Sequence, residues 1–309
     1  MASKKREVKL FGKEIPVRDY DCRNVMDNQR NRFKKDRVNL FIQVTGRCNA
    51  RCKFCEWHTG SSCFDIEKLG RILKEITSRD DIMIRKLNFT GGEPTLDIIK
   101  FNEVVGCTRD YIKLDEKPEI TLNTNGIHLL DLVPYERYID SIGLSRHHYD
   151  DKINTDIFQS DKVADIETIS EFQNRVKNKG LVQLRCNVIT GYIETFEDVK
   201  RYLNHAIAAG VYDCGFVTLM PINDYCKEHQ VDFYKLLDTN DENIIKVNGF
   251  VREEDGCQVC ECGNYVYSDY QGHFCKFYNR YFSCCDLTEG QLVYDGQYLR
   301  YGFGGDIIY

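Results

Sequence analysis

Apolar and polar residues follow two different periods between residue 38 and about residue 225. Short runs rich in β-branched and aromatic residues, such as 38–45 and 182–189, predict strands. Segments 66–76 and 196–209 instead carry apolar residues at helical spacing, and Gly210 is a stop signal for the second. The same reading predicts further strands at 87–90, 119–126, 140–145 and 215–219, and a helix near 163–176.

Six predicted strands separated by helices favour parallel pairing through right-handed crossovers. The fold class is therefore α/β, and the pattern allows either a curved partial barrel or a doubly wound sheet. In both architectures ligands bind at the carboxyl ends of the strands. The candidate motifs described below all fall at such ends, which predicts a functional site there.

The alternation of predicted strands and helices does not continue outside this central region. Residues 1–36 are polar and charged, and we expect an extension with little core of its own. Residues 37–229 form the predicted barrel domain. Residues 230–309 are rich in Tyr, Gly and Cys, with short strand-like pieces at 265–267 and 291–294. This part predicts a small C-terminal domain that needs a metal to help it fold.

Charge and composition narrow the class of protein. The chain has 309 residues and a net charge of −6, with both signs interspersed, and this argues against a nucleic-acid partner. No apolar run approaches the ~20 residues that span a bilayer, so no membrane partner is expected. The basic N-terminus lacks the apolar core of a secretory signal, and we expect a cytoplasmic protein.

Fifteen cysteines are many for a protein in a reducing compartment, where metal binding or catalysis is the usual reason. Most of them form two groups, while the scattered ones are expected to be ordinary small side chains. The first group is Cys48, Cys52, Cys55 and Cys63; the second is Cys257, Cys260, Cys262, Cys275, Cys284 and Cys285.

The spacing of Cys48, Cys52 and Cys55 fits three corners of a [4Fe–4S] cluster, which four cysteines normally close. A fourth iron without a protein ligand suggests catalysis, as an open position does at other metals. The alternative is a structural zinc site, in which His58 or Cys63 supplies the fourth ligand.

Three motifs together carry a family resemblance. Cys48-x3-Cys52-x2-Cys55 follows the first predicted strand, and Gly91-Gly92-Glu93-Pro94 follows the second. The segment 187–194 is similar to a GxIxGxxE pattern, with Asn187 in place of the first glycine. Over roughly residues 38–225 the chain resembles radical S-adenosylmethionine (SAM) enzymes. The resemblance implies a partial (β/α)6 TIM-like barrel.

The resemblance also implies the chemistry. A [4Fe–4S] cluster on the three cysteines would bind SAM, and its reduction would yield a 5′-deoxyadenosyl radical that removes a hydrogen atom from substrate. Gly91, Gly92, Glu93 and Pro94 would contact SAM, with Glu93 accepting from its ammonium group. The alternative for these four residues is an ordinary tight turn.

Other residues at strand ends are expected to contact the cofactor or substrate, although each also fits plain core or a solvent-exposed turn. Arg146, His147 and His148 are the catalytic candidates, as an anion site or as acid and base. The further cofactor-binding candidates are Phe54, Thr124, Asn125, Ser145, Asn187, Leu219 and Met220.

The second cysteine group resembles the auxiliary-cluster extension (twitch or SPASM type) of many radical SAM enzymes. Cys257, Cys260 and Cys275, together with the segment 216–221, are similar in layout to the GTP cyclase family of molybdopterin synthesis. The resemblance implies a second Fe–S cluster, with Cys262, Cys284 and Cys285 as extra candidate ligands and zinc as the alternative metal. The arginine pair expected to hold a triphosphate is missing, which speaks against GTP.

We therefore expect an enzyme that oxidises, epimerises or forms carbon–carbon bonds in a small biosynthetic molecule, with flavodoxin or ferredoxin as reductant. A maturase of a ribosomally made peptide is the alternative, disfavoured because 36 residues are too few for a separate peptide-binding domain. A non-enzymatic zinc or Fe–S sensor is a third reading, and it predicts no cleavage of SAM.

Overall fold

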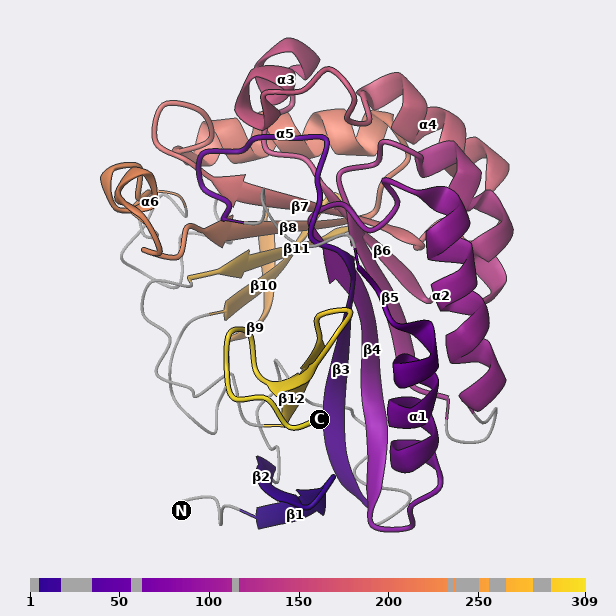
Figure 1. Ribbon diagram of the computed structural model, residues 1–309. Coiled ribbons are helices and arrows are strands. Elements are labelled where there is room, and N and C mark those ends of the chain that lie inside the picture. Colours follow the sequence, from indigo (N-terminus) through magenta and orange to yellow (C-terminus); the bar gives the residue numbers. More distant parts are fainter. Residues whose placement is uncertain are drawn as a thin grey trace.

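The computed structural model describes residues 6–17, 35–56, 63–112, 117–232, 236, 250–255, 265–279 and 290–309, and the account below concerns these residues. They form a two-stranded sheet and an eleven-stranded sheet, with the larger helices along one face of the larger sheet (Figure 1). None of the helices in these ranges combines the length and the apolar character that a bilayer crossing requires.

Six parallel strands form the centre of the larger sheet, and they are neighbours in the order in which they occur along the chain. In a doubly wound sheet the order of the strands along the chain would reverse at a switch point. The unbroken order therefore confirms the partial barrel. The strands are β3 (Asp36–Thr45), β4 (Ile82–Gly91), β5 (Glu119–Thr124), β6 (Ser141–Ser145), β7 (Val182–Val188) and β8 (Asp213–Thr218).

Each α-helix between or after these strands begins where a short polar side chain accepts a hydrogen bond from the first turn. Asp65, Asp97, Asp150 and Asp165 do this for the first four α-helices. Thr195 does so within a capping box, and Asn223 caps the last. The helices are α1 (Ile66–Thr77), α2 (Ile98–Tyr111), the 3-10 helix η1 (Leu129–Arg137), α3 (Asp151–Phe158), α4 (Ile166–Arg175), α5 (Phe196–Ala208) and α6 (Asp224–Glu228).

Successive residues of these strands face opposite sides of the sheet, so the two faces differ in chemistry. Leu40, Leu87, Leu122 and Phe216 are fully buried members of the main core, on the face that the helices cover. Their sequence neighbours point to the other face and are largely polar. The helices are therefore held by apolar burial, while the inner face is left for polar groups.

The C-terminal strands extend this sheet at both edges. At one edge β11 (His273–Tyr278) pairs parallel with β8, and β10 (Tyr265–Tyr270) and β9 (Phe250–Asp255) continue outward. At the other edge β12 (Gln291–Tyr294) pairs parallel with β3 and is followed by β13 (Leu299–Tyr301). Within the described ranges, the strands of the predicted C-terminal domain thus form no sheet of their own. The domain division itself stays a prediction.

The N-terminal segment differs from expectation. Residues 6–17 form a hairpin of β1 (Arg6–Leu10) and β2 (Lys13–Val17), joined by a two-residue turn with positive φ at Phe11 and Gly12. Val8, Leu10, Ile15 and Val17 are buried in the main core, and the Phe11 ring stacks on Tyr309. These residues thus add to the main core, which was not expected because alternation over only five residues was too short a signal. The boundary of an N-terminal extension at residue 36 stays a prediction.

Leu10→Ala is expected to lower the free energy of unfolding by about 2–5 kcal/mol, because it removes a fully buried side chain from the main core. Glu7→Ala changes an exposed residue of the same strand and serves as the control, with an expected change within about 0.5 kcal/mol. Urea unfolding followed by circular dichroism measures both. Equal stabilities for the two variants would show that the hairpin is not part of the cooperative unit.

Candidate functional site

The loop that carries Cys48, Cys52 and Cys55 follows β3 and is clamped against the loop that follows β4. The backbone N–H of Gly92 donates to the carbonyl of Thr45, and that of Glu93 donates to the carbonyl of Arg47, both at 2.8 Å. A Cβ on Gly91 or Gly92 would lie 2.2 Å from one of these two carbonyl oxygens. Only glycine permits this approach, so the two loops are matched to each other.

A second set of contacts fixes Cys48 from β5. The side-chain amide of Asn125 donates to Asn49 Oδ1 at 2.8 Å and reaches the Cys48 sulfur at 3.8 Å. The backbone N–H of Ala50 also donates to that sulfur, at 3.4 Å. Such N–H···S contacts stabilise a thiolate, which is the form that binds iron.

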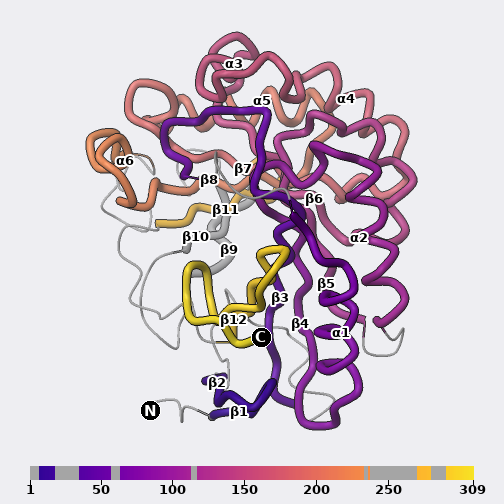
Figure 2. The backbone as a smooth tube through the Cα atoms, in the orientation of Figure 1, coloured from indigo at the N-terminus to yellow at the C-terminus, as the bar shows by residue number. Residues whose placement is uncertain are grey.

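The far side of the loop is held by α3 and α6. The N–H of Arg51 donates to the carbonyl of Phe158, at the end of α3, at 2.8 Å. Asn223, the cap of α6, donates to the carbonyl of Lys53 at 3.2 Å. Figure 2 shows the loop after β3 passing across the sheet edge toward α6. The backbone of the cysteine loop is therefore held by the loop after β4, by the end of α3 and by the start of α6.

The three thiols share one partly buried environment. Burial raises the pKa of the Cys52 thiol to about 12, and the neighbouring Cys55 and Cys48 add to the effect. Burial likewise raises the pKa of Cys48, with Glu93 and Cys55 contributing. Without a cation the Cys48 and Cys52 thiols stay neutral at neutral pH. Iron binding replaces their protons and offsets the cost of burying thiolates.

The arrangement of the thiols bears on the choice of metal. Within the ranges that the structure describes, no three or more His, Cys, Asp or Glu side chains converge on one ion position. Cys63 is exposed, and His58 lies outside the described residues. Cys48, Cys52 and Cys55 lie together in one small apolar cluster, and the kind of metal that they bind stays a prediction at this point.

Glu93 is buried beside the cysteine loop, with 1% of its surface exposed. Its Oε1 accepts from the backbone and hydroxyl of Thr95 and from the Thr124 hydroxyl, and its Oε2 accepts from the N–H of Asn125 at 2.7 Å. Burial raises the pKa of this carboxyl, and these four bonds oppose the rise. The carboxyl group therefore braces β4 against β5, and Oε2, with one partner, has the lone-pair capacity for a further donor such as an ammonium group.

Of the expected cofactor contacts, the structure brings Thr124, Asn125 and Glu93 together at Cys48. Phe54 packs on the His147 ring, at 5.0 Å between centroids, and belongs to the small apolar clusters beside the loop. The other candidates are spread along the same sheet edge. Ser145 and Asn187 are half-buried at the ends of β6 and β7, Leu219 is buried, Met220 is 48% exposed and Pro94 is buried. Their contact with a cofactor stays a prediction.

The three catalytic candidates after β6 are packed inside the protein. Arg146 is 1% exposed; it forms an ion pair with Asp151 at 2.7 Å and donates to the carbonyl of Tyr149. His147 accepts from the N–H of Asn187 through Nδ1 and stacks on Phe158. His148 accepts from the N–H of Asp150. Each side chain has a structural partner, and a catalytic role for the three residues stays a prediction.

The C-terminal cysteines are described at one position only. Cys275 lies on β11, fully buried, beside Cys214 of β8 in the register of the sheet. The other candidate ligands, Cys257, Cys260, Cys262, Cys284 and Cys285, lie outside the described residues. The second cluster therefore stays a prediction.

Sequence reasoning missed the side chains that hold the cysteine loop. Asn49, Phe158 and Asn223 are distant in sequence or uninformative in type, so no local pattern singled them out. A polar residue between the first two cysteines was a weak signal for Asn49. Arg185, whose contacts are described below, was hidden inside a predicted strand.

Gly92→Ala is expected to reduce the iron retained after anaerobic reconstitution at least severalfold. Its Cβ would collide with the Arg47 carbonyl, so the cysteine loop must move. Gly106→Ala in α2 is the matched control, because a Cβ there meets no atom within 4 Å. Iron and sulfide per chain, with circular dichroism to check folding, measure the effect. Equal iron in the two variants would contradict the proposed clamp.

The burial of His147 predicts that the free energy of unfolding depends on pH. Burial lowers its pKa to about 3, with Arg146 adding to the effect. The unfolded chain therefore binds a proton below about pH 6.5 that the folded chain does not, and stability falls as the pH falls. Between pH 7 and pH 5 this histidine should account for about 2 kcal/mol. Urea unfolding of the metal-free protein measures it: His147→Phe should lose that part of the pH dependence, and an unchanged slope would refute the assignment.

Comparison with known proteins agrees with this geometry. A family model described as the radical SAM superfamily matches residues 42–237. The GTP 3′,8-cyclase of Peptoclostridium acidaminophilum is 28% identical over 193 residues, 60% of this chain and 56% of that protein. That of Mycolicibacterium smegmatis is 26% identical over 213 residues, 65% and 56%. The chain thus spans little more than half the length of these curated relatives.

Two solved structures share the fold. Streptococcus suis SuiB bound to SAM has a TM-score of 0.58 at 13% identity, covering 85% of this chain and 59% of SuiB. Native anSMEcpe with bound SAM has a TM-score of 0.51 at 17% identity, covering 68% and 62%. The family match covers well over half of the chain and includes the clamped cysteine loop, and this protein therefore belongs to the radical SAM superfamily.

Proposed function

We propose that the protein is an enzyme that cleaves SAM reductively and removes a hydrogen atom from a small biosynthetic molecule. The observation that carries the proposal is the loop of three thiols held by Gly91–Gly92 at the carboxyl end of the sheet. A [4Fe–4S] cluster supplies the electron that breaks the carbon–sulfur bond. The chain's own residues position the thiols, cover them with apolar side chains and present the buried Glu93 carboxylate beside them.

Glu93 suits the cationic end of SAM. Its carboxylate is buried and accepts only from neutral donors, and Oε2 has one such partner. An ammonium group there would offset the charge that burial disfavours. This would link cofactor binding to the brace between β4 and β5.

The inner face of the sheet suits a polar substrate. Asn88 and Thr121 form a buried hydrogen bond of 2.6 Å on that face. Farther along, Arg185 of β7 forms an ion pair of 2.9 Å with Asp213 of β8. Gly215 makes room for the guanidinium, because a Cβ there would lie 2.8 Å from Arg185 Nη1. Arg185 keeps a third of its side chain exposed, which leaves donors for an anionic substrate group.

The substrate class separates two versions of the proposal. The relatives found by sequence are named for a reaction of GTP, which favours a small molecule, although the missing arginine pair speaks against GTP itself. A peptide substrate is the second candidate. The likeness to SuiB covers 85% of the chain, more than the cyclase alignments do, and a related structure has SuiB bound to its precursor peptide. A second Fe–S cluster on the C-terminal cysteines would serve either substrate.

SAM cleavage tests the proposal directly. Reconstituted anaerobically and reduced with dithionite, the wild-type protein should release 5′-deoxyadenosine, and Cys52→Ala should lower that rate at least 100-fold because the cluster loses a ligand. Cys63→Ala alters an exposed cysteine outside the loop and should leave the rate unchanged. Chromatography of the nucleoside product measures all three. No product from the wild type would favour the sensor alternative.

The same material tests the second cluster. The Cys48/Cys52/Cys55 triple-alanine variant should retain about four irons per chain if the C-terminal cysteines hold a [4Fe–4S] cluster. Iron near zero would remove that cluster from the proposal, while leaving the cleavage of SAM untouched.

A further inference from the structure

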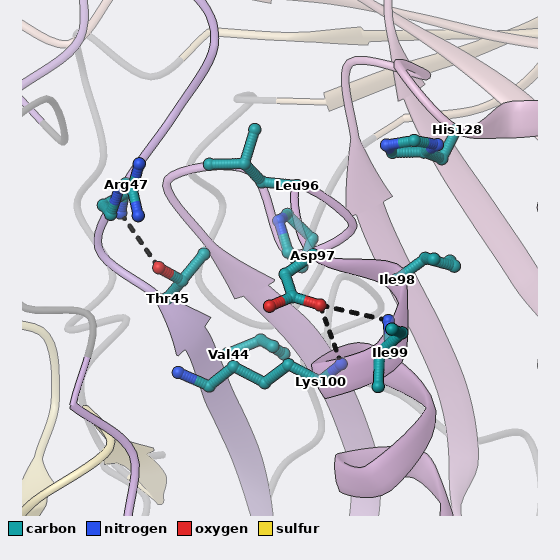
Figure 3. Close-up of a pocket in the computed structure, with 10 residues that line it drawn as sticks. Val44, Thr45, Arg47, Leu96, Asp97, Ile98, Ile99, Lys100 and His128 are labelled. Atoms are coloured by element: carbon teal, nitrogen blue, oxygen red, sulfur yellow. Dashed lines mark hydrogen bonds between the residues drawn. The ribbon is translucent and has the colours of Figure 1, made fainter.

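A hollow of about 560 Å³ lies outside the barrel, between the cysteine loop and the start of α2 (Figure 3). Thr45 and Arg47 form one wall, and Asp97 with the first three residues of α2 forms the base. Figure 3 shows Arg47 and His128 on opposite sides, with Asp97 between them. Apart from Pro94, which was predicted to contact the cofactor, the site described above does not use the side chains of this hollow.

The hollow has a cationic rim in an otherwise acidic protein. Arg47 is exposed and Lys100 is half-exposed, and the chain as a whole carries a net charge of −6. His128 adds no free charge, because its Nδ1 lies 3.0 Å from Asp131 Oδ2. Asp97 is the one carboxylate among the lining residues, and it is occupied by the N–H groups of residues 99 and 100 at 3.1 and 3.0 Å. A negatively charged surface is therefore favoured here.

An apolar side chain stands at the same place. Ile99 is 71% exposed, the largest exposed fraction among the large apolar residues that the structure describes as exposed. An apolar contact surrounded by charge is typical of small transient protein interfaces, in which charge guides association and a few contacts give affinity. The hollow thus has the features of a docking surface for a protein with an acidic face.

The position of the hollow indicates which protein would dock. Arg47, which lines one wall, immediately precedes Cys48 in the sequence. The carbonyl of Arg47 accepts a hydrogen bond from the backbone N–H of Glu93. A partner seated here would lie within one residue of the first iron ligand. Electron transfer slows steeply with distance, so this is a favourable entry point for an electron.

We propose that this hollow docks a small acidic electron-transfer protein of the flavodoxin or ferredoxin class. In the transfer step the reduced donor loses one electron and the cluster on Cys48, Cys52 and Cys55 gains it, with no atom exchanged. The proposal rests on the proposed function, because it assumes that this cluster needs a reductant. It adds the surface that the reductant uses and the sign of its charge.

Ile99→Glu and Ile99→Lys form a matched pair that tests the sign of this charge. Both remove the apolar side chain at an exposed position, and they differ only in the charge that they bring. Ile99 is the second residue of α2, where Glu favours the helix and Lys disfavours it. If helix stability controls the rate, Ile99→Glu should be the faster variant. If docking to an acidic partner controls it, Ile99→Lys should be the faster one.

The rate of 5′-deoxyadenosine formation is measured with reduced flavodoxin, with a reduced acidic ferredoxin and with dithionite. Relative to the wild type, Ile99→Glu should lower kcat/KM for the protein donors about tenfold, and Ile99→Lys should leave it equal or raise it. With dithionite, the wild type and both variants should react at equal rates. Added salt should weaken the difference. Equal rates for the two variants with both protein donors, or an equal loss in both, would overturn the proposal.

A binding measurement keeps the two proposals distinct. Titration of the cluster-loaded proteins with oxidised flavodoxin and ferredoxin should give about tenfold weaker binding to Ile99→Glu than to Ile99→Lys. If dithionite yields no 5′-deoxyadenosine from the wild type, the proposed function fails, and this titration still decides the docking surface. Identical affinities for the pair would exclude it.

Discussion

Two backbone hydrogen bonds hold the functional edge of this protein together. The N–H groups of Gly92 and Glu93 reach across to the carbonyls of Thr45 and Arg47, and they can do so only because two successive residues lack a Cβ. The loop that begins at those carbonyls then carries all three thiols. A local steric condition after β4 thus sets the position of a loop after β3, and through it the site at which a cluster would bind.

Successive residues of each barrel strand face opposite sides of the sheet, and the two sides have different roles. Residues that face the helices are apolar and fully buried, and they supply the burial that stabilises the fold. Their neighbours face inward. They include Asn88 of β4, which accepts from Asn123 of β5, and Arg185 of β7, which pairs with Asp213 of β8. A barrel that filled its centre with aliphatic side chains would have no room for a substrate. This one instead commits hydrogen-bonding groups there, at positions that adjacent glycines keep open.

The buried polar groups Arg146, His147 and Glu93 near the cysteines have partners in neighbouring elements. Arg146 and His147 were attractive as catalytic residues because charged and titratable groups follow a strand end. In the structure Arg146 pairs with Asp151 and His147 accepts from Asn187, so both connect β6 with neighbouring elements. The buried Glu93 carboxyl also has partners, and all four of its hydrogen bonds come from neutral donors.

The sequence by itself determined the class of fold, the three-thiol loop and the glycine pair, because each depends on local periodicity or on close spacing. Alternating strands and helices predicted six parallel strands, and the structure has them in that order. Tertiary structure alone decided the rest. The hairpin of residues 6–17 joins the core, the C-terminal strands close both edges of the sheet, and Asn125, Phe158 and Asn223 hold the cysteine loop. Those contacts join residues far apart along the chain, and spacing within a sequence carries no information about which distant side chains meet.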